Sequence, residues 1–368
     1  MYVIELKGRI DSTNAMDEEK RIMDLIEKNP DESISFDASG LSYISSAGLR
    51  VLMKVKKQIK ADLQITDVSP EVYDIFETTG FTQLFNVRKK YREISVDGCE
   101  VIGKGAYGTV YRLDEDTVVK KYDSAEALSM IENEKKLARL AFVAGIPTAI
   151  SFDIVKIGDT YGSVFEMLKA KTFNDLIKEN PANTDDIIKQ YTDLIKQVHS
   201  TNLPAGALPS SRQKYFEKLK KIKQIIPEKL YGKIEGFLNG IPEDDHLIHG
   251  DLQMKNIMLS DNEPMLIDMD TLSQGIPLFD IAGIYVAYIV FEEDEPGNNM
   301  KFFGIATETG KKIWDGVCKN CLREEDFDKM QILAYVLFLD MFKNSSPDDE
   351  LSATRIRHSI KHLEELLR

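Results

Sequence analysis

The chain has 368 residues, 43% of them hydrophobic, and a formal net charge of −14. A chain of this length is expected to fold into two or more domains with sizeable cores. The acidic balance argues against a general nucleic-acid-binding protein, and the longest apolar run is too short to span a membrane.

Residues 1–87 alternate between strand and helix patterns, and their first residues lack the apolar core of a signal peptide. Strands are expected at 2–10, 33–39 and 63–68, and amphipathic helices at 14–29 and 45–60. A third helix is predicted at 69–80, with Ser69 as N-cap, Pro70 at the first helical position and Gly80 as the stop. This alternation predicts a small α/β domain whose helices pack on a mixed sheet.

The stretch "FDASGLSYISSAGLRVL" at 36–52 contains a serine turn at the start of the second helix. Together with "LKGRID" near the N-terminus, it resembles the signature of STAS domains, the fold of anti-sigma-factor antagonists. The resemblance implies a phosphorylated serine, here Ser46, that controls binding of an anti-sigma-factor-like or other regulatory protein. Ser45 or Ser46 is equally well explained as a helix N-cap, and a capping serine can also carry a phosphate.

A charged passage at 86–98 indicates a junction, and the pattern changes beyond it. Hairpin-like strands are expected up to about residue 122, followed by a helix at 124–145 and strands near 148–168. From 172 onward the chain is predicted to be mostly helical, interrupted by a strand pair around 246–267. The apolar run at 281–291 has the length of a buried helix.

Three glycines, Gly103, Gly105 and Gly108, have G-x-G-x-x-G spacing and are followed by Val110. A dinucleotide-binding loop has the same glycines but opens a helix, whereas these run into two strands joined by an acidic turn. Glycines in a hairpin let backbone N–H groups close over phosphates. An ordinary glycine-containing hairpin is the alternative, and the residues that follow argue against it.

The next expected strand, "DTVVKKYD", places Lys120 and Lys121 on opposite faces. One of them can point inward beneath the glycine loop and meet phosphates. A buried lysine needs a counter-ion, and the following helix offers Glu132 and Glu134.

At this point the sequence resembles the protein-kinase-like superfamily, and most closely its aminoglycoside- and choline-kinase-like phosphotransferases, over about residues 95–290. The resemblance implies that Lys120 contacts the phosphates of ATP and that Glu134 is its partner. "VFEML" resembles the hinge that holds adenine, near Glu166 and Leu168.

"HGDLQMKN" resembles the catalytic loop of this superfamily, which makes Asp251 the expected base and Asn256 a ligand of Mg²⁺. "MLIDMD" resembles the metal-binding strand end, with Asp268 as the second ligand. "PLFDIA" resembles a later structural aspartate, Asp280. The expected cofactors are therefore ATP and Mg²⁺, and the expected partner substrate is a hydroxyl acceptor.

Several features depart from typical protein kinases. Gly250 stands where those enzymes carry Arg, eleven residues separate Asp268 from Asp280, and no Ala-Pro-Glu motif follows. A peptide-docking activation segment has no room here, so a small molecule or an unusual hydroxyl substrate is favoured. We expect the helices across 172–240 to shape the acceptor pocket and His199 to be a packed structural residue.

We therefore predict a bacterial-type cytoplasmic protein with an α/β STAS-like domain at 1–90 and an α+β bilobal protein-kinase-like domain at 91–368. The N-lobe is expected at about 91–168 and the C-lobe at about 169–368. The predicted reaction transfers the γ-phosphate of ATP to a small molecule or a protein serine, including the protein's own Ser46. The rival hypothesis is an anti-sigma-factor antagonist whose kinase fold only senses nucleotide. Cys318 and Cys321 form a lone CxxC, interpreted as two ordinary helix thiols, and no nucleic-acid or membrane partner is expected.

Overall fold

The computed structural model describes residues 1–59, 63–105, 108–124, 126–168, 170–346 and 349–368. The chain divides into two compact units. Unit 1 comprises Met1–Gly98 with Ile154–Gly162, and unit 2 comprises Cys99–Asp153 with Ser163–Arg368. Each unit has an apolar core of its own. Among the described residues, no helix is both long and apolar enough to cross a membrane.

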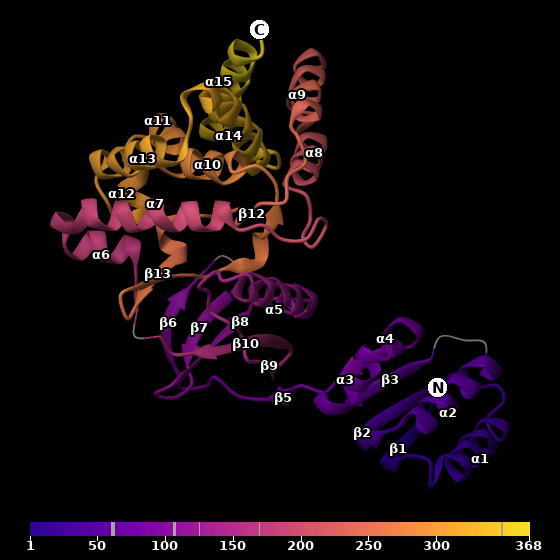
Figure 1. Ribbon diagram of the computed structural model, residues 1–368. Helices are drawn as coiled ribbons and strands as arrows, with labels where there is room; N and C mark the ends of the chain where they lie inside the picture. The colour runs from indigo at the N-terminus through magenta and orange to yellow at the C-terminus, as the bar shows by residue number, and fades with distance from the viewer. Residues whose placement is uncertain (60–62, 106–107, 125, 169, 347–348) are drawn as a thin grey trace. The chain divides into compact units, whose positions relative to one another are not determined.

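Unit 1 is built on a four-stranded sheet with the order β1-β2-β3-β4, connected by helices (Figure 1). Its elements are β1 (Tyr2–Ile10), α1 (Ala15–Glu27), β2 (Ile34–Ile44), α2 (Ser46–Ile59), β3 (Gln64–Val68), α3 (Pro70–Thr78), α4 (Phe81–Leu84), β4 (Asn86–Lys89) and β5 (Arg92–Glu93). The prediction of a mixed sheet is wrong, because all three neighbouring pairs among β1–β4 run parallel. Each connection passes through a helix, so each strand re-enters the sheet from the same end.

Helix α3 shows how local sequence sets the boundaries in unit 1. The Ser69 hydroxyl accepts a hydrogen bond from the N–H of Val72, and Pro70 takes the first helical position, as predicted. Gly80 follows the helix with a φ of +76°, a left-handed conformation that favours glycine.

The N-terminal part of unit 2 contains an antiparallel meander next to helix α5 (Figure 1). Its elements are β6 (Glu100–Lys104), β7 (Gly108–Arg112), β8 (Thr117–Tyr122), α5 (Leu128–Val143) and, from Ser163 on, β10 (Thr160–Glu166). Most of β9 (Asp153–Ile157) is grouped with unit 1. The strand order is β10-β8-β7-β6, and Val110 is the register partner of both Gly103 and Lys120. Gly108 is required for this close pairing, because a Cβ there would lie 2.1 Å from the carbonyl oxygen of Lys121.

The rest of unit 2 is mainly helical, with short strands between the helices (Figure 1). Its elements are β11 (Lys171–Thr172), α6 (Phe173–Glu179), α7 (Thr184–Ser200), α8 (Ser211–Ile222), α9 (Glu228–Gly240), β12 (Leu247–Ile248), β13 (Ile257–Ser260), β14 (Glu263–Leu266), β15 (Ser273–Gln274), α10 (Leu278–Tyr285), α11 (Phe291–Asp294), α12 (Asn298–Phe303), α13 (Thr307–Cys321), α14 (Phe327–Phe342) and α15 (Glu350–Leu366). The predicted helix at 281–291 contains a π-helical turn, Val286–Val290. The loops between β12, β13, β14 and β15 carry Asp251, Asn256 and Asp268 of the candidate site.

Candidate active site

Lys120 lies in the middle of β8 and is close to two carboxylates from other segments. Its Nζ is 3.5 Å from Oε1 of Glu134 on α5 and 3.0 Å from Oδ1 of Asp268, which follows β14. The other oxygen of Glu134 accepts a hydrogen bond of 2.5 Å from the hydroxyl of Tyr122. Burial by itself would lower the pKa of Lys120, but the charges of Glu134 and Asp268 raise it above its ordinary value. The positively charged ammonium group of Lys120 is therefore held in place by Glu134 and Asp268, on the strand next to the glycine-loop hairpin.

The catalytic-type loop joins β12 to β13 and brings Asp251 and Asn256 into contact. Oδ2 of Asp251 accepts hydrogen bonds from Nδ2 of Asn256 at 2.7 Å and from Nε2 of Gln253 at 3.0 Å. Burial raises the pKa of Asp251, and the hydrogen bond from Gln253 opposes this shift. A partly buried carboxylate with a raised pKa is a suitable proton acceptor.

Two aspartates, Asp268 and Asp270, follow the end of β14. Asp268 has a φ of +65°, and its side chain is 40% exposed, so it is open to a ligand as well as to Lys120. Burial, followed by the charge of Asp268, raises the pKa of Asp270 to about 6. Asp270 was not among the predicted site residues, although the second carboxylate of "IDMD" is visible in the sequence.

Asn256 and Asp268 are suitable oxygen ligands for Mg²⁺, which strongly prefers oxygen. The amide nitrogen of Asn256 is used by Asp251, which leaves its oxygen for an ion. Within the described ranges, no group of three or more His, Cys, Asp or Glu side chains is placed to hold a metal. A magnesium–nucleotide site does not need one, because Mg²⁺ takes one or two protein carboxylates and completes its shell with phosphate and water.

Asp280, at the start of α10, binds the backbone of the catalytic-type loop through its carboxylate. Its carboxylate accepts hydrogen bonds from the backbone N–H of His249 at 3.0 Å and of Gly250 at 2.6 Å, and contacts Nε2 of His199 at 2.9 Å. Burial would raise the pKa of Asp280, but these hydrogen bonds and the nearby imidazoles lower it below its ordinary value. Asp280 and His199 are packed, hydrogen-bonded residues that fix the loop.

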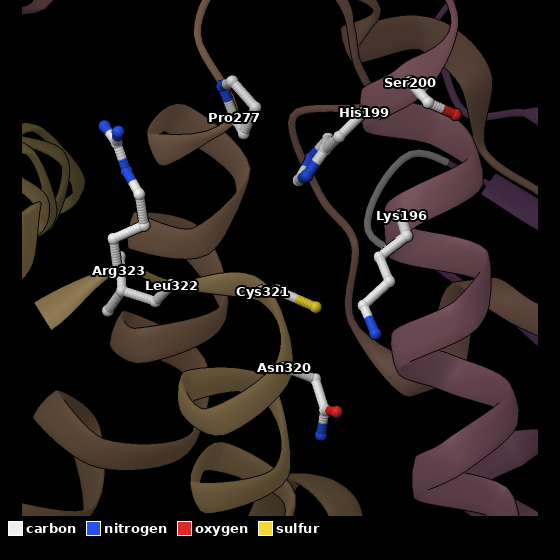
Figure 2. Close-up of a pocket in the computed structure, with 8 residues that line it drawn as sticks. All are labelled: Lys196, His199, Ser200, Pro277, Asn320, Cys321, Leu322 and Arg323. Atoms are coloured by element: carbon white, nitrogen blue, oxygen red, sulfur yellow. The ribbon is translucent and has the colours of Figure 1, made fainter.

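His199 also forms part of the wall of a surface pocket of about 320 Å³ (Figure 2). Lys196 of α7 and Cys321 of α13 line the same pocket. Burial raises the pKa of Cys321 to about 11, and both Cys318 and Cys321 are free thiols on α13. The thiolate form that redox chemistry needs is therefore disfavoured at Cys321.

Gly250 has a conformation that explains why this loop departs from typical protein kinases. Its φ is +89°, and a Cβ there would lie 2.9 Å from both Cβ and the carbonyl oxygen of Thr271. The Thr271 hydroxyl also donates to the carbonyl of His249 at 2.6 Å. An arginine cannot occupy this position without moving the segment after Asp268.

The glycine loop and the hinge candidates lie on the strands around Lys120. The N–H of Gly105 donates to the carbonyl of Gly108 at 2.9 Å, which closes the β6–β7 hairpin. Residues 106 and 107, between them, lie outside the described residues. Glu166 ends β10 and Leu168 follows it, on the connection that leads to β11.

Ser46, the candidate phosphosite, is the first residue of α2 in unit 1 and is exposed. The side chain of Ser45 accepts a hydrogen bond of 3.2 Å from the N–H of Ala47, and its carbonyl accepts from the N–H of Leu49. Ser45 therefore takes the capping role, and the Ser46 hydroxyl is exposed at the start of the helix. A phosphate there would be favoured by the helix dipole.

Comparisons with known proteins agree with this architecture. Residues 98–305 match the model of the phosphotransferase enzyme family, and residues 1–94 match that of the STAS domain. Over 90 residues the chain is 34% identical to BtrV of Bordetella bronchiseptica, which carries the name of an anti-sigma factor antagonist. That match covers 24% of this chain and 77% of BtrV.

Two solved structures illustrate the likeness of unit 2. A thermostable mutant of aminoglycoside phosphotransferase APH(4)-Ia in its apo form matches with a TM-score of 0.54 and 11% identity, over 80% of this chain and 97% of that one. ADP-bound aminoglycoside phosphotransferase APH(2'')-Ib matches with a TM-score of 0.50 and 16% identity, over 80% and 98%. Identities this low show the fold alone, and the predicted STAS-like domain followed by a kinase-like domain is confirmed.

Proposed function

Since this chain belongs to the phosphotransferase enzyme family and begins with a STAS domain, we propose that it transfers the γ-phosphate of ATP to a hydroxyl group and that the STAS domain regulates or receives this transfer. The observation that carries the proposal is the convergence of five polar side chains from separate segments of unit 2. Lys120, Glu134 and Asp268 form one connected group, and Asp251 and Asn256 form another.

In the proposed reaction the acceptor oxygen forms a bond to the γ-phosphorus, and the bond to the oxygen bridging the β- and γ-phosphates breaks, which releases ADP. Asp251 orients the acceptor hydroxyl and takes its proton. Lys120 holds the phosphates, and Glu134 keeps Lys120 in place. Mg²⁺, held by Asn256 and Asp268, would neutralise phosphate charge when bound. In this state Lys120 would exchange its contact with Asp268 for a contact with phosphate.

The proposal predicts that Asp268→Ala removes the magnesium-dependent part of ATP affinity, because one of two metal-binding side chains is lost. Titration calorimetry with ATP, in the presence and absence of Mg²⁺, measures this difference. Asp315→Ala is the matched control, since Asp315 is an exposed aspartate on α13.

Unchanged magnesium-dependent binding in Asp268→Ala would contradict the metal assignment. Wild-type protein that binds Mg-ATP and never turns it over would favour the rival function, a nucleotide-sensing partner of a regulatory protein.

We further propose that Ser46 is an acceptor of this phosphate, in cis or between two copies. Two observations support the proposal: Ser46 is exposed at a helix start, and a second serine already provides the cap. Covalent linkage to the kinase-like unit also raises the effective concentration of the acceptor. A phosphate dianion on Ser46 would change the affinity of the STAS domain for a regulatory protein.

The Ser46 proposal predicts that wild-type protein incubated with Mg-ATP becomes phosphorylated on Ser46, as mapped by mass spectrometry. Phosphate at this position should be absent from Ser46→Ala and from Asp251→Asn. If Ser46 stays unmodified while the enzyme phosphorylates another acceptor, self-phosphorylation is wrong.

A further inference from the structure

The carboxylate of Asp251 is held asymmetrically. Both amide donors of the loop, Nδ2 of Asn256 and Nε2 of Gln253, bind the same oxygen, Oδ2. Among the residues that the structure describes, no donor lies within hydrogen-bond distance of Oδ1. The two oxygens of Asp251 are thus in different environments, and only Oδ1 is left for a substrate.

We propose that Gln253 is a positioning residue for the phosphotransfer reaction: with Asn256 it holds Oδ2 of Asp251 so that Oδ1 alone receives the acceptor proton. The inference rests on the proposed function and adds a residue to it. Gln253 therefore affects the orientation of the base.

The backbone on both sides of Gln253 is fixed by buried tyrosines. The hydroxyl of Tyr191, on α7, donates to the carbonyl of Leu252, and the hydroxyl of Tyr288 accepts from the N–H of Met254 at 3.1 Å. Both tyrosine side chains are fully buried. A residue held at its two neighbouring peptide groups has little freedom, so its side chain is pre-organised toward Asp251.

Tyr288 reaches the loop from the π-helical turn Val286–Val290. A π-helical turn changes the direction in which the following side chains point, and such turns are frequent at functional sites. Asn299 of α12 donates to the Tyr288 carbonyl at 3.0 Å, and the Tyr288 ring stacks on Phe303 with a centroid distance of 4.9 Å. These contacts fix the turn, and through it the position of Gln253.

Loss of a positioning contact on the base is expected to lower kcat, because Asp251 no longer presents Oδ1 in one orientation, and to leave KM for Mg-ATP unchanged. Loss of a residue that binds the nucleotide would raise KM instead.

The test measures hydrolysis of Mg-ATP, with water as the acceptor, by the full-length protein. Gln253→Leu should lower kcat by about 10- to 100-fold and leave KM for Mg-ATP unchanged. Gln253→Glu, which has the same shape but lacks the amide donor, should lower kcat as well. Gln224→Leu, at an exposed glutamine after α8, is the matched control and should behave as wild type.

Active wild-type protein with unchanged kcat in both Gln253 variants would overturn the inference alone. A higher KM with unchanged kcat would also overturn it, because Gln253 would then contact the nucleotide. Wild-type protein with no more turnover than Asp251→Asn would overturn the proposed function, and the role of Gln253 with it.

Discussion

Asp251→Asn is expected to lower phosphate transfer by about 10²- to 10⁴-fold, or roughly 3–5 kcal/mol of activation free energy, while ATP binding stays close to wild type. The asparagine keeps a carbonyl oxygen that can accept the hydrogen bonds now made by Gln253 and Asn256. It cannot accept a proton from the acceptor hydroxyl. Turnover of ATP and calorimetric ATP affinity, measured on the same preparation, separate the two effects.

Asp315→Asn provides the matched control for this experiment, because it makes the same chemical change at an exposed position on α13. Near wild-type turnover in Asp251→Asn would mean that Asp251 is a structural residue of the loop. Loss of ATP affinity together with turnover would mean that the carboxylate contributes to nucleotide binding.

The loop motif around Asp251 could be predicted from sequence because its residues are close together in the chain. Residue patterns alone predicted an ion pair between a lysine of β8 and a glutamate of the following helix. They did not decide between Lys120 and Lys121, or between Glu132 and Glu134. The family resemblance chose Lys120 and Glu134, and these two side chains do lie together. Their roles in phosphate transfer stay predictions.

Other features depend on tertiary contacts that leave no local signal. The pKa of Asp270 is raised mainly because the fold buries it, and this burial cannot be read from "IDMD", although its neighbour Asp268 can. The hydrogen bond from the Tyr191 hydroxyl to the carbonyl of Leu252 joins residues that are 61 positions apart in the chain. Strand direction in unit 1 was also missed, because alternation along a strand is the same in parallel and antiparallel sheets.

Asp280→Ala is expected to lower the free energy of unfolding of unit 2 by about 2–6 kcal/mol. The substitution leaves the N–H groups of the buried His249 and of Gly250 without their charged acceptor, and each such loss costs about 1–3 kcal/mol. His199 loses its contact as well. Chemical denaturation followed by the fluorescence of Trp314, the one tryptophan in the sequence and a buried residue of α13, reports on this unit.

The effect of Asp280→Ala is also expected to depend on pH in one direction. The folded protein holds the pKa of Asp280 below its ordinary value of 3.8, so the ionised form is the stabilising one. This contribution is fully present above pH 3.8 and is lost as the pH falls through the lower, folded-state pKa. The difference in unfolding free energy between wild type and Asp280→Ala should therefore be constant near neutral pH and shrink in strong acid. A difference in unfolding free energy that grows as the pH falls would mean that Asp280 is protonated in the folded protein. The carboxylate would then not be the charged acceptor for the N–H groups of His249 and Gly250.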